Sequence, residues 1–196
     1  GTYTVVVEDE NECPISIEVE ITESEVMTIS ETHSNYNNTG FGVSCYGESD
    51  GSIDITVEGG SGIYTYLWSN GETTEDLNDI PAGIYSVQVE DENNCPISIQ
   101  VEITEPDAEM TISETHSNYN GFGVSCNGES DGSIDITVEG GSGTYTYLWS
   151  NGETTEDLNN IPAGTYTVVV EDENECPISI DVEITESGVM TISETH

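Results

Sequence analysis

The sequence contains no lysine and no arginine. Its 196 residues include 40 aspartates and glutamates, so the formal charge at pH 7 is −40 with the three histidines neutral. Phosphate groups are bound mainly by Lys and Arg, so this absence excludes nucleic acid as a partner, together with anionic membrane surfaces and phosphate-handling active sites. Long apolar runs are also missing, since no stretch approaches the roughly 20 residues of a membrane span, and no segment has the pattern of a signal peptide. We therefore expect no insertion into a membrane.

Strong helix formers are almost as scarce. The chain has 4 Leu and 3 Ala but 20 Ile, 17 Val and 10 Tyr. β-Branched and aromatic residues favour strands, whereas the residues that favour helices are nearly absent. The high net charge is typical of disordered chains, but the many Ile and Val residues supply an apolar face for a sheet. The composition therefore predicts an all-β protein.

The chain repeats itself with a shift of 81 to 82 residues. Gly42–Glu105 matches Gly123–Glu186 at 56 of 64 positions without a gap. Such periodicity indicates a tandem array of similar domains. By this alignment we predict the end of a preceding repeat at 1–23, a first full repeat at 24–105, a second full repeat at 106–186, and the start of a following repeat at 187–196.

Apolar and polar residues alternate along most of each repeat. Ile53, Ile55 and Val57 alternate with polar residues, which predicts a strand with one buried face. Asn70-Gly71 predicts a two-residue hairpin turn. Antiparallel strands with one dry face and Gly-rich turns favour a small β-sandwich. The other inward rows are Tyr64, Tyr66 and Trp68; Tyr85, Val87 and Val89; and Ile97, Ile99, Val101 and Ile103, after an irregular opening strand over 27–30 and 41–43.

Several side chains are assigned by this alternation. Trp68 and Trp149 are expected in the core, while Leu67 and Leu148 point to the opposite face and leave apolar surface there. The Ile-Pro-Ala-Gly-x-Tyr run of 80–85 resembles the tyrosine corner of immunoglobulin-like domains, in which the hydroxyl bonds the backbone.

Each full repeat has two cysteines, and the leading fragment has one. Six strands in up-and-down order place the two cysteine-bearing turns of a repeat at the same end. We therefore favour disulfides within repeats, Cys45–Cys95 and Cys126–Cys176, with the partner of Cys13 outside the chain. The alternative joins neighbouring repeats, Cys13 with Cys45 and Cys95 with Cys126.

The same strand order leaves one difficulty. Six strands bring both ends of a repeat to one side, whereas a linear array needs them on opposite sides. Either a seventh strand lies within 72–78 or the connector over 105–124 runs back along the domain. The residues alone do not decide between these alternatives.

Acidic turns beside the cysteines are the candidate metal site. If each disulfide forms within a repeat, two acidic loops converge and offer the oxygen ligands that Ca²⁺ prefers. Calcium is thus the one candidate cofactor, although no dedicated calcium-binding motif is present, and solvated surface turns are the alternative. The candidate ligands are Glu48, Asp50, Asp91 and Glu92 in the first repeat, and Glu129, Asp131, Asp172 and Glu173 in the second.

The ordered motifs of each repeat resemble the SprB-repeat family. They are Cys-Asn-Gly-Glu-Ser-Asp-Gly-Ser-Ile (126–134), Gly-Gly-Ser-Gly-Thr-Tyr-Thr-Tyr-Leu-Trp-Ser-Asn-Gly (140–152), Leu-Asn-Asn-Ile-Pro-Ala-Gly-Thr-Tyr-Thr-Val (158–168) and Glu-Asp-Glu-Asn-Glu-Cys (171–176). The family is named for a very large cell-surface adhesin of gliding bacteria. The resemblance implies tandem immunoglobulin-like antiparallel β-sandwiches, type IX secretion, and a role in surface adhesion and gliding. An insert at 31–40 is longer than the family's usual first strand.

Two hypotheses of function follow. The first is a structural stalk of a secreted bacterial cell-surface adhesin or filament, outside the cell, whose partners are neighbouring repeats and the motility or secretion machinery. The second is a binding module whose repeats grip polysaccharide or a solid surface multivalently. An enzyme is not expected, because no nucleophile motif or phosphate-binding loop appears.

Overall fold

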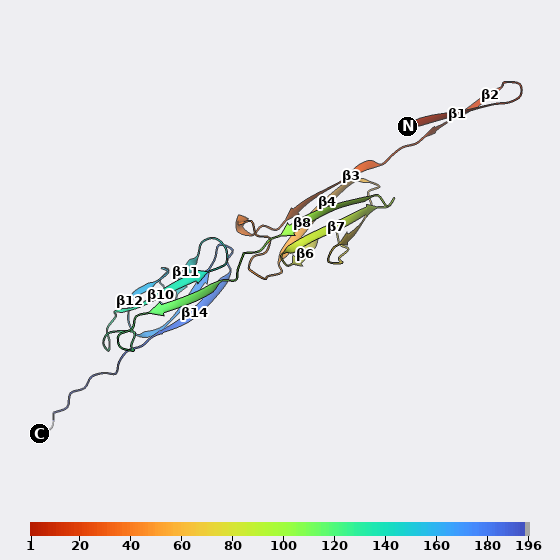
Figure 1. Ribbon diagram of the computed structural model, residues 1–196. Coiled ribbons are helices and arrows are strands. Elements are labelled where there is room, and N and C mark those ends of the chain that lie inside the picture. The colour runs from red at the N-terminus through yellow and green to blue at the C-terminus, as the bar shows by residue number, and fades with distance from the viewer. Residues whose placement is uncertain (195–196) are drawn as a thin grey trace. The chain divides into compact units, whose positions relative to one another are not determined.

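The computed structural model describes residues 1–194 and is built from β-strands (Figure 1). Strands form several antiparallel sheets and make up 51% of the chain, and the described part contains no α-helix. The predicted all-β class is confirmed. The last two residues of the predicted segment 187–196 lie outside the described residues.

Fourteen strands and one short 3₁₀ helix follow one another along residues 1–194. They are β1 (Thr2–Glu8), β2 (Pro14–Glu20), β3 (Glu25–His33), η1 (Tyr36–Asn38), β4 (Gly51–Gly60), β5 (Tyr64–Trp68), β6 (Leu77–Ile80), β7 (Gly83–Asp91), β8 (Pro96–Ile103), β9 (Thr111–His116), β10 (Gly132–Glu139), β11 (Thr146–Trp149), β12 (Leu158–Ile161), β13 (Gly164–Glu171) and β14 (Pro177–Ile184).

The chain forms two compact units. One contains residues 1–32, 54–76 and 85–101, and the other contains residues 33–53, 77–84 and 102–196. The second unit therefore holds the whole second repeat as well as the cysteine-bearing loop of the first repeat.

Two three-stranded sheets form the second repeat, in the orders β12-β10-β9 and β11-β13-β14. Figure 1 shows these strands in green to blue. One hydrophobic cluster joins the sheets, with Ile134 and Ile136 from β10 and Val168 and Val170 from β13, all at most 3% exposed. Two sheets that share one core in this way form a β-sandwich.

The first repeat has the same sheets, in the orders β3-β4-β6 and β5-β7-β8. Its predicted inward rows are buried at Ile53, Ile55, Val57, Trp68, Tyr85, Val87, Val89, Val101 and Ile103. Ile97 and Ile99 are half-buried, as are Tyr64 and Tyr66. Residues 41–43 belong to no strand, so the opening strand is the continuous β3.

The strand order is that of an immunoglobulin sandwich. In chain order β9 to β14 correspond to strands A, B, C, E, F and G, with A, B and E in one sheet and C, F and G in the other. Strand D is replaced by the irregular segment 150–157. The fold is thus a tandem array of immunoglobulin-like sandwiches, as predicted.

The predicted Asn-Gly hairpin is wrong. The turn itself forms, because the Gly152 N–H donates to the Trp149 carbonyl at 2.9 Å. However, β11 pairs with β13, and β12 pairs with β10, so the turn connects strands in different sheets. Without strand D the chain does not reverse between them, and β11 and β12 run in the same direction.

The crossing of the chain from one sheet to the other between β11 and β12, here called the crossover, determines at which end of the repeat each cysteine lies. The Gly123 N–H donates to the Thr185 carbonyl at 2.8 Å, so the loop after β9 lies where β14 ends. Cys126 follows this loop, whereas Cys176 directly precedes β14. An eight-residue strand spans about 26 Å, so the two cysteines of one repeat lie at opposite ends of the sandwich. The six strands per repeat were predicted correctly, but their up-and-down order was not.

The leading fragment forms a two-stranded hairpin, β1-β2. Thr2 pairs with Glu20, just as the equivalent Thr165 pairs with Glu183 in β13-β14. The hairpin therefore has the register of a complete repeat. Its apolar residues are exposed, however, at 53% for Val5 and 58% for Val7.

Candidate functional site

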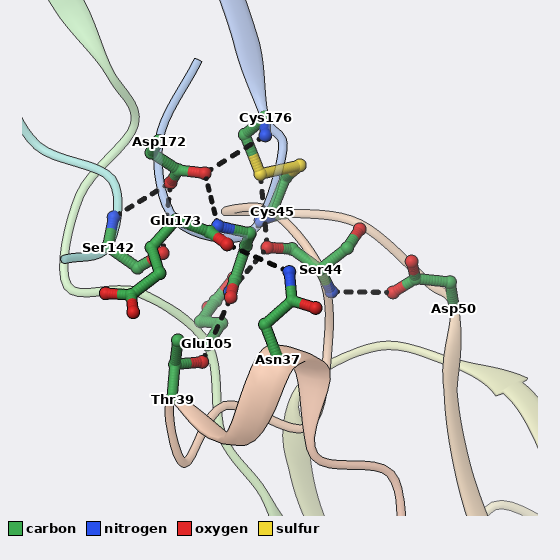
Figure 2. The surroundings of a disulfide bond; sticks show 12 residues. Asn37, Thr39, Ser44, Cys45, Asp50, Glu105, Ser142, Asp172, Glu173 and Cys176 are labelled. Carbon is green, nitrogen blue, oxygen red and sulfur yellow. Dashed lines mark hydrogen bonds between the residues drawn. A yellow bond between two sulfur atoms is a disulfide. The ribbon is translucent and has the colours of Figure 1, made fainter. Parts of the chain in front are cut away.

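A disulfide joins Cys45 to Cys176, with the two Cα atoms 5.8 Å apart and 131 residues apart in sequence (Figure 2). The first cysteine of one repeat is thus bonded to the second cysteine of the next. Cys13, Cys95 and Cys126 are free and exposed. The predicted pairs Cys45–Cys95 and Cys126–Cys176 are therefore wrong, as is the alternative set. The physical reason is the crossover, because a disulfide needs Cα atoms within about 7 Å and one repeat holds its cysteines a strand length apart.

Cys176 is held by a turn built around Asp172. One oxygen of this carboxylate accepts the backbone N–H groups of Asn174 and Cys176, at 2.9 and 3.0 Å. The other accepts the N–H and the hydroxyl of Ser142, at 2.8 and 3.1 Å. Although Asp172 is only 4% exposed, the four donors satisfy its charge. The turn thus fixes the direction of the Cys176 side chain.

Glycine is required beside this turn. Gly141 has a φ of +68°, and a Cβ there would lie 2.6 Å from the Met110 Cγ and 2.8 Å from the Asp172 Oδ2. Only a residue without a side chain fits this backbone and this space.

The same turn precedes both free cysteines of this type. The Asp91 carboxylate accepts the N–H groups of Asn93 and Cys95, each at 2.9 Å. Asp9 likewise accepts the N–H group of Cys13, at 3.0 Å. The Cys95 N–H group is the largest cause that lowers the pKa of Asp91, and the Cys13 N–H group does the same for the pKa of Asp9. The turn therefore forms whether or not its cysteine is bonded.

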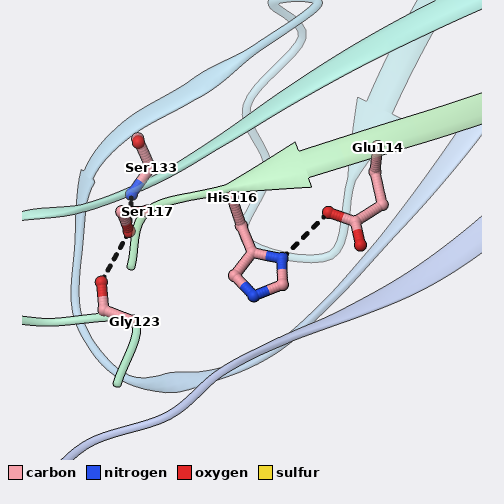
Figure 3. Close-up of polar contacts among 5 residues, drawn as sticks. All are labelled: Glu114, His116, Ser117, Gly123 and Ser133. Atoms are coloured by element: carbon pink, nitrogen blue, oxygen red, sulfur yellow. Dashed lines mark hydrogen bonds and ion pairs between the residues drawn. The ribbon is translucent and has the colours of Figure 1, made fainter. Parts of the chain in front are cut away.

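The loops that carry the first cysteines are also alike. Figure 3 shows the second repeat, where the Ser117 hydroxyl donates to the Gly123 carbonyl at 2.5 Å and accepts the Ser133 N–H at 2.9 Å. Beside them, the His116 ring nitrogen Nδ1 lies 3.0 Å from a carboxylate oxygen of Glu114. In the first repeat the Ser34 hydroxyl contacts Gly42 and Ser52 in the same way.

The end of each repeat holds this loop from the other side. The Glu105 carboxylate accepts the Gly47 N–H at 2.7 Å, and the Glu186 carboxylate accepts the Gly128 N–H at 2.8 Å. The loops of Cys45 and Cys126 are thus fixed at two equivalent points.

Hydrogen bonds surround the disulfide on the side of η1 (Figure 2). The Asn174 side chain donates to the Ser44 carbonyl and accepts the Thr39 hydroxyl, both at 3.0 Å. The Asn37 side chain donates to the Glu173 carbonyl at 2.8 Å. Asn174 is 6% exposed, whereas the equivalent Asn93 is exposed. The loop of one repeat therefore covers the turn of the next.

Sequence reasoning missed Asn37, Thr39, Ser44 and Asn174 as junction residues. The one signal was the insert at 31–40, which was noted as long but not assigned a role. The first repeat reads Asn-Asn-Thr-Gly at 37–40, where the second has Asn-Gly at 120–121. The extra residues form the end of η1 and supply the Thr39 hydroxyl.

The predicted calcium ligands are distributed differently from the prediction. Within the second repeat Glu129 and Asp131 lie beside Cys126, and Asp172 and Glu173 lie beside Cys176, so the two acidic loops do not converge. Within 1–194 no group of three or more His, Cys, Asp or Glu side chains is arranged to hold a metal ion.

Several of these carboxylates already accept backbone hydrogen bonds. The Ser125 side chain and N–H lower the pKa of Asp131. Asp50 accepts the Ser44 N–H at 3.0 Å. Glu92 takes part through its backbone, because its N–H donates to the Ser61 hydroxyl at 2.9 Å. Glu48 is exposed and lines a cavity of about 250 Å³ next to the disulfide, together with Asp172.

The predicted aromatic and apolar positions are confirmed. Trp68 and Trp149 are 2% and 1% exposed, and the Trp149 indole donates to the Thr155 carbonyl at 2.8 Å. Leu67 and Leu148 are 57% and 58% exposed. Burial, followed by the charge of Glu75, raises the pKa of Tyr66 to about 12.

The tyrosine corner is also present. In the second repeat the Tyr166 hydroxyl donates to the Pro162 carbonyl at 2.9 Å. The hydroxyl therefore fixes the turn before β13, which is the structural role that the motif predicts.

Across the described residues, no helix has the length and hydrophobicity needed to cross a membrane.

Fold and junction together define a class, tandem immunoglobulin-like sandwiches of which two are joined by a disulfide. The family model described as "SprB repeat" matches residues 43–73 and 124–154. The predicted resemblance is confirmed, because the model matches one segment in each of the two full repeats. SprB repeats come from cell-surface proteins.

A solved structure described as "Structure of amphioxus IgVJ-C2 molecule" is 15% identical, covers 64% of this chain and 90% of its own, and has a TM-score of 0.30. No curated protein matches the chain.

Proposed function

We propose that the chain is part of the stalk of a secreted bacterial cell-surface adhesin or filament that serves gliding motility and surface attachment. Its repeats hold an adhesive part away from the cell. The neighbouring repeats are its direct partners, and the motility or type IX secretion machinery anchors the whole. The four segments defined by the sequence alignment, 1–23, 24–105, 106–186 and 187–196, are consecutive pieces of this stalk.

One observation carries this proposal, the disulfide between successive repeats. A force applied to the two ends of the chain passes from Cys45 through the sulfur atoms to Cys176, and 131 residues of sequence are bypassed. The strands between them cannot extend while the bond holds. Closing a loop of this length stabilises the fold by about 5 kcal/mol in the chain-entropy model. A bond at this place is suited to a stalk that must keep its length under load.

The charge supports the same role. The buried carboxylates among the described residues are Asp91 and Asp172, and both lie in turns that satisfy them with N–H groups. Most of the other acidic side chains lie exposed on the surface. Like charges repel over a screening length of about 8 Å at physiological salt, which keeps neighbouring filaments apart.

An extracellular location is supported by the disulfide, because such bonds persist mainly in oxidising compartments. The family match supports the cell surface in particular. A catalytic role is not part of the proposal, because SprB repeats and immunoglobulin-like sandwiches are structural domains.

The second candidate is a repeat that binds polysaccharide or a solid surface. Leu67 and Leu148 favour it, because each lies more than half exposed at the same position of its repeat.

Binding of this chain to glycan arrays and coated surfaces separates the two functions. If the chain is a stalk, its binding to glycans and coated surfaces stays at background. Saturable binding that Leu67→Ser with Leu148→Ser abolishes would replace the stalk by the binding module. Ile63→Ser with Ile84→Ser is the matched control, because both residues are 62% exposed and removing them also lowers the apolar surface.

A further inference from the structure

We propose that the three free cysteines are unpaired halves of the Cys45–Cys176 type of bond, each completed by a repeat of this kind placed beside it. Cys126 accepts the second cysteine of a following repeat. Cys13 and Cys95 each accept the first cysteine of a preceding repeat. The array would then carry one disulfide at every junction. This inference rests on the proposed stalk function.

The loop of Cys126 is held by the same hydrogen bonds as the loop of Cys45. Both follow Gly-Val-Ser and lie in loops that a serine hydroxyl and a C-terminal glutamate hold at equivalent atoms. The difference is exposure, because Cys45 is half-buried in its junction and Cys126 is exposed. The loop of Cys126 thus matches the loop of Cys45 at these points, but its cysteine is not bonded.

Cys95 is likewise prepared as Cys176 is. In both the Asp91 turn and the Asp172 turn, one carboxylate oxygen accepts two backbone N–H groups. The corresponding hydrogen-bond lengths agree within 0.1 Å. Cys176 is 8% exposed in its junction, whereas Cys95 is exposed. Because the turn forms before any bond, the thiol is already oriented for a neighbouring loop.

Pairing within one repeat does not compete. Cys126 and Cys176 lie at opposite ends of β14, and Cys176 is already bonded to Cys45. A neighbouring repeat is the partner whose cysteine reaches the right place by simple repetition of the observed junction.

Each bond forms by thiol–disulfide exchange with a small-molecule disulfide such as oxidised glutathione. One cysteine thiolate attacks it, forming a mixed disulfide and releasing one small thiolate. The second cysteine thiolate displaces the other small thiol and closes the protein bond. Two cysteine thiols lose two electrons and two protons, and one small disulfide is reduced to two thiols.

The test lengthens the chain by its own sequence. Residues 190–196 repeat 110–116, so adding residues 117–186 after His196 completes a third repeat with further copies of Cys126 and Cys176, of which the copy of Cys126 is changed to Ser. The added segment also carries Ser179→Thr so that its cysteine peptide has its own mass. Trypsin does not cut a chain without Lys or Arg, so a protease that cleaves after Glu is used under non-reducing conditions after alkylation of free thiols.

We expect the extended chain to contain two disulfides, Cys45–Cys176 and Cys126 with the added cysteine, while Cys13 and Cys95 are alkylated. The unextended chain should show Cys126 fully alkylated. The inference is overturned if Cys126 is still alkylated in the extended chain, or if it is found joined to Cys95 or Cys176. Replacing the added cysteine by Ser should return Cys126 to the alkylated form. Failure here leaves the glycan and surface binding test of the stalk unaffected, so the two failures are distinguishable.

Discussion

Single carboxylates decide the local structure at each second cysteine. Asp9, Asp91 and Asp172 each accept the N–H group of the cysteine four residues later, and this bond closes the turn. In a chain with 40 acidic residues, these three are therefore structural and not part of the solvated coat. The turn has the same hydrogen bonds whether its cysteine is in a disulfide or free. The carboxylate, and not the disulfide, therefore determines the structure of the turn.

Asp91→Asn tests this role through pH. The Cys95 N–H and its companions hold the pKa of Asp91 below its ordinary value of 3.8. A lowered pKa in the folded state adds stability that is present above pH 3.8 and is lost as the pH falls through the lowered pKa. We expect the variant to melt at a lower temperature than the natural chain at pH 7, and the difference to shrink below pH 3.8.

The matched control is Asp54→Asn, which removes one charge from the exposed face of β4. Its melting temperature should follow that of the natural chain across the same pH range. A difference between the Asp91 variant and the natural chain that stays constant down to pH 2 would contradict the assignment.

At the scale of strands and turns, much of the repeat could be predicted from alternation alone. The inward rows of β4, β5, β7 and β8 were assigned correctly, because a period of two separates a dry face from a wet one. The path between β5 and β6 could not be predicted. Asn70-Gly71 has the residues of a hairpin turn, but which sheet Leu77 joins depends on its burial against the core, at 2% exposure.

The disulfide pairing depended on this one crossover. The residues around β6 do not indicate in which direction this strand runs. If its direction is reversed, the expected position of Cys95 moves from one end of the repeat to the other. The calcium prediction depended on the same step. The hydrogen bonds between the two repeats could not be predicted from local residues. Thr39 and Asn174 are 135 residues apart, and their contact depends on how the two repeats are placed.

Hydrogen bonds from the Asn174 side chain should stabilise the Cys45–Cys176 disulfide. Asn174→Ala removes the hydrogen bonds to Ser44 and Thr39, each contributing about 0.5 to 1.5 kcal/mol net. We expect the equilibrium constant for Cys45–Cys176 formation, measured in glutathione redox buffers, to fall by about tenfold or more.

Asn93→Ala is the control at the equivalent, exposed position of the first repeat. It should leave the constant for the Cys45–Cys176 bond unchanged. Equal effects of the two variants would show that the asparagine acts within its own turn and not across the junction.

The molecule carries most of its charge on the surface and its one disulfide between two repeats. Cations should therefore act on the coat and not at a single site. Titration with Ca²⁺ and with Mg²⁺ at constant ionic strength should raise the melting temperature equally, because diffuse screening does not distinguish the two ions. An increase with Ca²⁺ alone, reversed by a calcium chelator, would establish the site predicted from the sequence.

A covalent bond between repeats should limit how far the chain extends, and pulling the chain by its two ends measures this limit. Cys13, Cys95 and Cys126 are replaced by Ser so that the Cys45–Cys176 bond alone can form. After complete unfolding, the oxidised chain should be shorter in contour length than the reduced chain by about 450 Å, the extended length of the 131 bypassed residues. Equal contour lengths in oxidising and reducing buffer would contradict the account.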